Sequence, residues 1–247
     1  MRCGEALRAT FDRRFLTSLL LLLAVRALEL ALGEGYRFSS DDGSLPTVYS
    51  KLTRVDIALY CVVPLFVLGS SGSLGRSLSP ATVLRWGSRR RMTRWHLLRS
   101  LVRGLAYSVV LVASALVAIS LRSPLSFPAP TAALFVPVEL ALETMFLSAC
   151  GMLLLASFVA SGHGGTSVLA VLAYASVDYL LGMTELSGDH LFATGWSLTT
   201  LTGSTGIVDV LGCAARLAAI LALLVLCCDV LLSGRDLLAE GGGRQDD

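Results

Sequence analysis

Hydrophobic and polar residues alternate along this chain in long blocks, not in the short periods of a soluble domain. A membrane-spanning helix needs roughly 20 predominantly apolar residues. Six blocks meet that requirement, namely residues 15–33, 55–73, 101–121, 138–160, 166–182 and 207–232. The pattern therefore predicts an all-α polytopic membrane protein with six transmembrane helices.

The composition supports lipid as the solvent. The 247 residues are 54% hydrophobic and 15% charged, whereas soluble domains are about 25% charged. The mean hydropathy is +0.71, and a soluble chain of this length could not bury so much apolar surface. Nineteen of the twenty basic residues are Arg. This bias is typical of a GC-rich genome and favours an actinobacterial source.

The distribution of basic residues predicts the orientation. Four precede the first span, eight lie at 76–103 and two follow the last span, whereas only four lie on the opposite side. By the positive-inside rule, both termini are cytoplasmic. Arg26 and Glu29 interrupt the first apolar segment and no small-residue cleavage site follows, so we expect an uncleaved helix and not a signal peptide.

The spans divide the chain into three parts: a cytoplasmic amphipathic segment at 1–14, a six-helix transmembrane domain at 15–232 and a cytoplasmic tail at 233–247. The transmembrane domain includes a basic cytoplasmic loop at 74–100, a polar outer loop at 34–54 and a long outer segment at 183–206 that reads as re-entrant. Four prolines in the outer connection 122–137 predict that it is not a continuous helix.

The cytoplasmic loop carries a specific pattern of helix starts and stops. Ser79-Pro80 is typical of a helix N-terminus, and Gly87 of a helix end. Ser88 can cap a second helix that continues through Trp95 into the third span. One interpretation is a topology anchor that touches anionic lipid; the other is a docking helix for a cytoplasmic partner, since an anchor needs charge but no caps.

At this point the chain resembles the ABC-2 type permeases, the membrane subunits of one class of ATP-driven exporters. The resemblance rests on six spans with both ends inside, a basic amphipathic segment at 4–14, the turn Arg85-x-Gly87-Ser88-Arg89 followed by Trp95, and the long outer segment between the last two spans. The chain is most similar to the small members of that family, which lack a fused ATPase.

The resemblance implies that the helix at 78–86 contacts a separate cytoplasmic ABC ATPase, which binds ATP and Mg²⁺, so no cofactor is expected in this chain. It also implies a homo- or heterodimer of permease subunits in a bacterial plasma membrane, exporting an amphipathic or peptide-like substrate. The residues expected to couple to the ATPase are Arg85, Trp86, Gly87, Ser88, Arg89, Arg90 and Trp95.

Ionisable residues inside membrane spans are functional candidates because they are costly to bury in lipid. The candidates are Arg26, Glu29, Glu139, Glu143, Asp178, Asp209 and Arg216. All seven are expected in the outer half of the bilayer, and Glu139 and Glu143 share a helix face. One interpretation is structural, with Arg26 and Arg216 paired to the two glutamates. The other is a polar outer vestibule that contacts a cationic or amphipathic substrate.

Enzyme signatures are absent from the sequence. It contains no G-x-x-x-x-G-K-[ST] phosphate loop, no H-E-x-x-H metal motif and no G-x-S-x-G elbow. His96, His163 and His190 lie in different loops, and His96 and His163 are expected at the surface. The six cysteines are expected to be small apolar helix residues. We therefore expect no enzymatic activity, no metal site and no nucleic-acid partner.

The alternative to an exporter subunit is a non-transporting immunity or scaffold protein that binds partners through the same basic loop.

Overall fold

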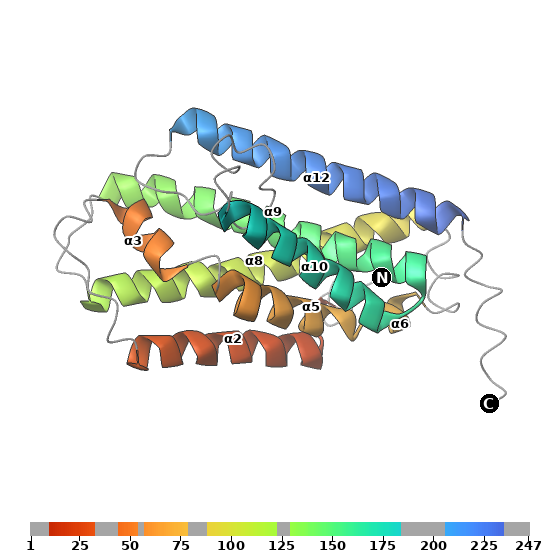
Figure 1. The fold of residues 1–247 in the computed structure, drawn as a ribbon, viewed down its shortest axis with the longest axis horizontal. Coiled ribbons are helices and arrows are strands. Elements are labelled where there is room, and N and C mark those ends of the chain that lie inside the picture. The colour runs from red at the N-terminus through yellow and green to blue at the C-terminus, as the bar shows by residue number, and fades with distance from the viewer. Residues whose placement is uncertain are drawn as a thin grey trace.

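A helix of 34 residues, α8 (Arg89–Arg122), runs through the bundle that the chain forms (Figure 1). The computed structural model describes residues 10–32, 44–53, 57–78, 88–122, 129–183 and 206–234. The other helices in these ranges are α2 (Arg13–Leu32), α3 (Leu45–Leu52), the π-helical turn η2 (Ala58–Val62), α5 (Val63–Ser71), α6 (Leu74–Ser77), α9 (Ala129–Ser161), α10 (Gly164–Met183) and α12 (Ile207–Gly234). No strand occurs among the described residues, which confirms the predicted all-α class.

Each predicted span overlaps a helix of the structure, although the helices differ in length and hydropathy. In the part of the chain that the structure describes, three helices are long and apolar enough to cross a membrane: Arg89–Leu121, Ala133–Ser161 and Ile207–Ser233. The apolar helices Leu59–Ser71 and Gly164–Val177 are shorter. The protein is therefore a membrane protein by the character of its helices, while the number of spans and their orientation stay predictions.

Helix α9 is the centre of the bundle, with α8, α10 and α12 packed around it, and α2 packs against α5 (Figure 1). Helix α3 lies at one end of the bundle, and α6 and the end of α12 lie at the other. Tyr107 of α8 connects the central helices to α2 and α5, because its ring contacts Phe15 and Phe66 at centroid distances of 5.5 and 5.3 Å. Its hydroxyl donates to Ser18 at 2.7 Å.

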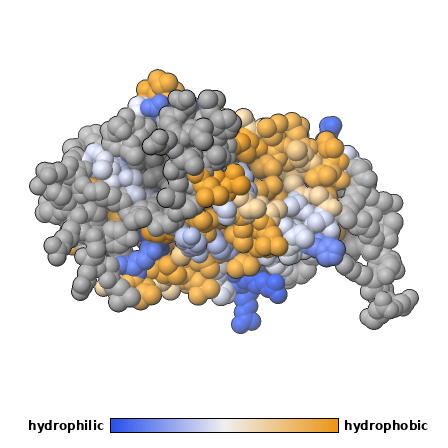
Figure 2. Space-filling view, viewed as in Figure 1, coloured by the Kyte–Doolittle hydropathy of each residue, from blue (hydrophilic) through white to orange (hydrophobic). Residues whose placement is uncertain are grey.

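Apolar side chains face outward as well as inward, as expected where lipid is the solvent. Helix α12 exposes large side chains along its whole length, including Ile207, Leu211, Leu223, Leu226 and Val230. Hydrophobic residues also cover much of the described surface on the face shown in Figure 2. A soluble domain rarely exposes contiguous apolar surface on this scale, so the exposed faces support burial in a bilayer.

Both outer connections contain helix that we did not predict. Helix α9 begins at Ala129 and continues through Pro137, so the second part of the connection 122–137 is helical, while residues 123–128 lie outside the described part of the chain. Pro130 is tolerated because the first N–H groups of a helix have no intrahelical partner. Pro137 removes one backbone hydrogen bond, and the packing of α9 against its three neighbours outweighs that loss.

The polar outer loop 34–54 contains a helix that we did not predict. Helix α3 begins after Ser44, whose hydroxyl accepts a hydrogen bond from the N–H of Thr47 at 3.4 Å, and Pro46 lies in its first turn. These are strong N-terminal signals. The helix is only eight residues long, which is why a search for spans of about 20 residues passes over it.

The packing of α2 on α5 depends on a glycine. A Cβ atom on Gly69 would lie 2.1 Å from the Ser18 hydroxyl oxygen. Gly69→Ala is therefore expected to destabilise the protein by about 1–3 kcal/mol, the usual effect of overpacking. Thermal unfolding of the full chain in detergent measures the change. Gly75→Ala is the matched control, because nothing lies within 4 Å of its Cβ position, and it should leave stability unchanged or slightly raised.

Candidate functional site

Arg26 of α2 is the centre of a buried polar cluster that also contains Glu29, Tyr49, Glu139 and Glu143, here named the Arg26 cluster. Only 3% of Arg26 is exposed. Its guanidinium donates to the Glu29 carboxylate at 2.7 Å, to the Leu52 carbonyl at 3.0 Å and to the Ser114 hydroxyl at 3.2 Å. One arginine thus joins α2, α3 and α8.

Two carboxyl groups of α9 form the other half of the Arg26 cluster. Glu139 and Glu143 are one helical turn apart and are 1% and 0% exposed. The Tyr49 hydroxyl donates to Oε1 of Glu143, and the Oε2 atoms of both glutamates have no hydrogen-bond partner among the described residues. Burial and the carboxylates of Glu143 and Glu139 raise the pKa of Tyr49 well above its usual range, so its hydroxyl stays protonated and donates.

Helix α3 therefore closes the Arg26 cluster from one end of the bundle. Tyr49 and Val48 are fully buried, and the Tyr49 ring packs edge-to-face against Phe135 of α9 at 5.2 Å between centroids. Sequence reasoning missed Tyr49 because it lies in a loop between predicted spans. The signal that could have found it was the Ser44 cap with Pro46, which marks a helix start ahead of an aromatic residue.

The structure brings together only some of the predicted intramembrane charges. Arg26 pairs with Glu29 and not with Glu139 or Glu143, so the predicted pairing is wrong for this arginine; the i, i+3 spacing on one helix makes Glu29 the nearer partner. Arg216 is half-buried on α12 and forms no ion pair with a described residue. The backbone of Asp178 lies in α10, and its side chain is outside the described part of the chain.

Asp209 lies apart from the cluster, exposed in the first turn of α12. Its carboxylate accepts a hydrogen bond from the backbone N–H of Gly206 at 3.0 Å. An acidic side chain is favoured there because the first N–H groups of a helix are unpaired and the helix dipole is positive at that end. Asp209 therefore stabilises the start of α12.

A second buried cluster, the Arg103 cluster of Asp12, His96, Arg99 and Arg103, was not predicted. Arg103 is 3% exposed; it donates to the Thr10 carbonyl at 2.8 Å and pairs with Asp12 at 3.3 Å. Arg99 pairs with the same carboxylate at 3.4 Å. Two arginines of the basic loop thus point into the protein, where they hold the residues before α2 against α8.

His96 is buried in this cluster at 4% exposure, so its predicted surface position is wrong. It lies on the same face of α8 as Arg99 and Arg103, which packs inward and not toward solvent. A cavity of about 20 Å³ lies between His96, Ser70 and Arg103, which is room for one water molecule. Trp95 is half-buried, with the Arg99 guanidinium 5.1 Å from its ring.

The predicted coupling residues fall partly within the described structure. Arg85, Trp86 and Gly87, and the rest of the helix expected at 78–86 beyond Leu78, lie outside the described residues. The carbonyl of Ser88 accepts the N–H of Met92 at 3.3 Å. Helix α8 therefore begins where the sequence predicted, directly after Ser88.

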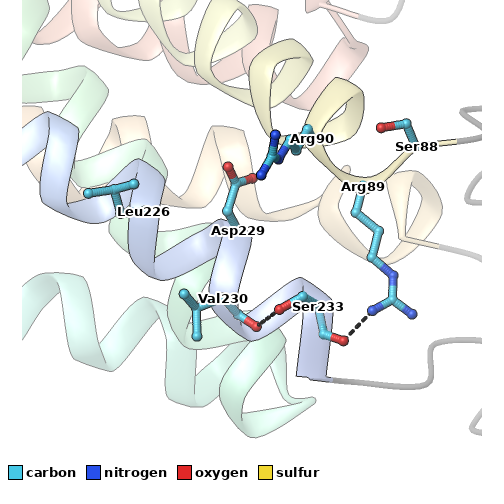
Figure 3. Close-up of a pocket in the computed structure, with 7 residues that line it drawn as sticks. All are labelled: Ser88, Arg89, Arg90, Leu226, Asp229, Val230 and Ser233. Carbon is cyan, nitrogen blue, oxygen red and sulfur yellow. Dashed lines mark hydrogen bonds between the residues drawn. The ribbon is translucent and has the colours of Figure 1, made fainter.

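A cleft of about 540 Å³ separates the start of α8 from the end of α12, here named the basic cleft (Figure 3). It is lined by Ser88, Arg89, Arg90, Leu226, Asp229, Val230 and Ser233. The Arg89 guanidinium donates to the Ser233 carbonyl, and the side chains of Arg90 and Asp229 point toward one another (Figure 3). The cleft therefore places two exposed arginines and one carboxylate at the junction of α8 and α12.

The comparisons with known proteins and the search for metal-binding groups add no assignment. The described ranges hold no group of three His, Cys, Asp or Glu residues that could bind a metal ion. No protein-family model matches this chain, and no curated protein and no solved structure matches it either.

The hydroxyl of Tyr49 is expected to hold α3 on the bundle. Tyr49→Phe leaves Oε1 of Glu143 buried without its donor, which should cost about 1–3 kcal/mol of stability. Thermal unfolding in detergent measures this loss. Tyr60→Phe removes the same atom from a side chain that is 71% exposed and should have no effect; equal stability of both variants would contradict the assigned hydrogen bond.

Proposed function

We propose that this protein is the membrane-spanning subunit of an ATP-driven exporter of the ABC-2 type, working with a separate cytoplasmic ATPase. In this proposal the chain crosses a bacterial plasma membrane six times with both termini inside, and it pairs with a second permease subunit. The support comes from the pattern of the sequence around residues 78–95 and from one feature of the structure, the continuity of α8.

Helix α8 connects the two ends of the bundle without a break. It begins at Arg89 in the basic cleft and carries Ser114, which accepts a hydrogen bond from Arg26 of the Arg26 cluster. At 1.5 Å per residue, these two positions are about 38 Å apart along the helix axis. A force applied to the first turn of α8 therefore reaches the Arg26 cluster through one rigid element.

Close packing makes α8 move together with α9. A Cβ atom on Gly104 of α8 would lie 3.0 Å from the carbonyl oxygen of Thr144 on α9. Helix α9 carries Glu139 and Glu143, so a shift of the α8–α9 pair changes their position relative to α2 and α3. In the proposed cycle, nucleotide-driven closure of the ATPases pushes on the helix expected at 78–86 and on the start of α8 that follows it, and the resulting shift opens the Arg26 cluster.

The chemistry of that cluster suggests the class of cargo. Glu139 and Glu143 are closed off by α3 in this conformation. Once exposed, two adjacent carboxyl groups lined by aromatic and aliphatic side chains favour a cationic, amphipathic substrate, since the acids attract charge and the walls accept apolar groups.

The association of this chain with an ATPase tests the proposed role of the basic cleft. Arg89→Glu combined with Arg90→Glu reverses two exposed charges at the basic cleft and is expected to abolish association with the ATPase. The measurement is purification of the tagged chain from its native membrane in mild detergent, followed by mass spectrometry of the proteins retained. Arg244→Glu, in the predicted cytoplasmic tail, is the control and should retain the partner.

The retained proteins also separate the two candidate functions. A stoichiometric soluble ATPase, lost in the double variant and kept in the control, supports the exporter. An intact, monodisperse chain that reproducibly lacks an ATPase overturns it in favour of the scaffold or immunity function.

A transport measurement tests whether the carboxyl groups of Glu139 and Glu143 contact the substrate. Glu143→Gln is expected to lower ATP-dependent uptake of a fluorescent amphipathic cation into inside-out vesicles more than Glu139→Gln does. The reason is that Glu143 is one turn deeper in α9 and receives the hydrogen bond from Tyr49. Both variants keep side-chain volume, and expression in the membrane is measured alongside. Wild-type uptake by both variants at normal expression would remove the carboxyl groups from the substrate path.

A further inference from the structure

An open groove of about 740 Å³ runs between α2 and α5, at the end of the bundle that carries the N-terminus of α2. Its lining includes Arg13, Arg14, Thr17, Leu21, Leu65 and Leu68. This volume lies within the range of about 300–1,000 Å³ that is typical of small-molecule sites. The groove is separate from both buried clusters and from the basic cleft, apart from Asp12, which borders it.

The mouth of the groove is positively charged. Arg13 and Arg14 are both exposed. Asp12 is the acidic residue among the groove's lining, and its carboxylate is directed to Arg99 and Arg103 at 3.4 and 3.3 Å. Because that carboxylate is engaged inside the protein, two cationic side chains remain at the mouth.

Arg14 lies beside Gly72, the residue that follows α5. A Cβ atom on Gly72 would lie 2.4 Å from Cδ of Arg14 and 2.8 Å from its Nη1. The outer part of the Arg14 side chain, including Cδ and Nη1, therefore lies close to Gly72, beside the end of α5 and the mouth of the groove.

The wall of the groove is apolar. Leu21 and Leu68 are 50% and 56% exposed, and Leu65 of α5 also lines the groove. Arg13 and Leu21 are eight residues apart on α2, which corresponds to about 12 Å along the helix axis. The groove thus presents two cations at one end and a leucine surface that extends from them along the helices.

This combination matches one kind of ligand. An anionic phospholipid carries a phosphate that suits paired arginines and an acyl chain that suits a leucine wall, and basic pockets between helices on the cytoplasmic side of membrane proteins bind such headgroups. The predicted orientation places the N-terminus of α2 at the cytoplasmic leaflet. We propose that the groove between α2 and α5 binds one anionic phospholipid of that leaflet, with the phosphate held by Arg13 and Arg14 and an acyl chain along Leu21, Leu65 and Leu68.

The inference rests on the predicted orientation and not on the export function, so either proposal can fail while the other stands. Native mass spectrometry of the full chain in detergent tests it, with phosphatidylglycerol and phosphatidylcholine of identical acyl chains as the added lipids. The wild-type protein is expected to retain one phosphatidylglycerol molecule and to prefer it over phosphatidylcholine. Equal retention of both lipids would overturn the proposal.

Arg13→Gln combined with Arg14→Gln should weaken phosphatidylglycerol binding by roughly tenfold or more, because each arginine near a lipid headgroup contributes to the attraction. Both side chains are exposed, so the fold should tolerate the change. The control is Arg91→Gln with Arg94→Gln, which removes the same charge from exposed positions on α8. Wild-type binding in the first variant, or an equal loss in the control, would contradict the assigned site.

A competition experiment with inorganic phosphate distinguishes a lipid from a free phosphate as the ligand of the groove. Inorganic phosphate at the same concentration is expected not to displace phosphatidylglycerol, since it gains nothing from the leucine wall. Displacement by phosphate would show a simple anion site and would overturn the assignment to a lipid.

Discussion

A buried cation in an apolar bundle must be compensated, and this requirement determines how α2 is attached. At one end, Arg103 of α8 binds the Thr10 carbonyl and the Asp12 carboxylate just before α2 begins. At the other end, Arg26 of α2 binds Ser114 of α8. Helix α2 has few large buried side chains of its own, so the two arginines supply the directional contacts that apolar packing in lipid does not. Loss of the paired carboxylate, Glu29 or Asp12, would leave a cation buried without its counter-charge, which is far more costly than loss of an ordinary hydrogen bond.

Much of the fold could be predicted because it follows from length, hydropathy and capping. The start of α8 after Ser88 was predicted correctly, since a serine followed by a long apolar-periodic helix is a local signal. The burial of His96 could not be predicted in the same way. Whether a polar residue near a span faces inward depends on which side of α8 meets its neighbours, and only tertiary packing decides that.

In the candidate site, too, local spacing could be predicted from the sequence, whereas contacts between distant helices could not. The i, i+4 spacing of Glu139 and Glu143 was visible in the sequence, but their contact with Tyr49 joins residues 94 positions apart. The predicted pairing of Arg26 with a glutamate of α9 is wrong for the opposite reason, because its partner Glu29 lies on the same helix at i, i+3 spacing. Pro137 was read by its general effect on helices, whereas α9 is stabilised by packing on three sides that a single lost hydrogen bond does not overcome.

The contact between Arg89 and Ser233 ties the first turn of one helix to the last turn of another. The final carbonyls of a helix have no partner within the helix, and a basic side chain near them serves as their cap. Arg89 therefore completes α12 from outside, although it belongs to α8. Only one N–H of the Arg89 guanidinium is used in this contact, so its other donors stay available at the basic cleft while the end of α12 remains capped. One side chain thus stabilises the end of the last helix and supplies a charge to the cleft.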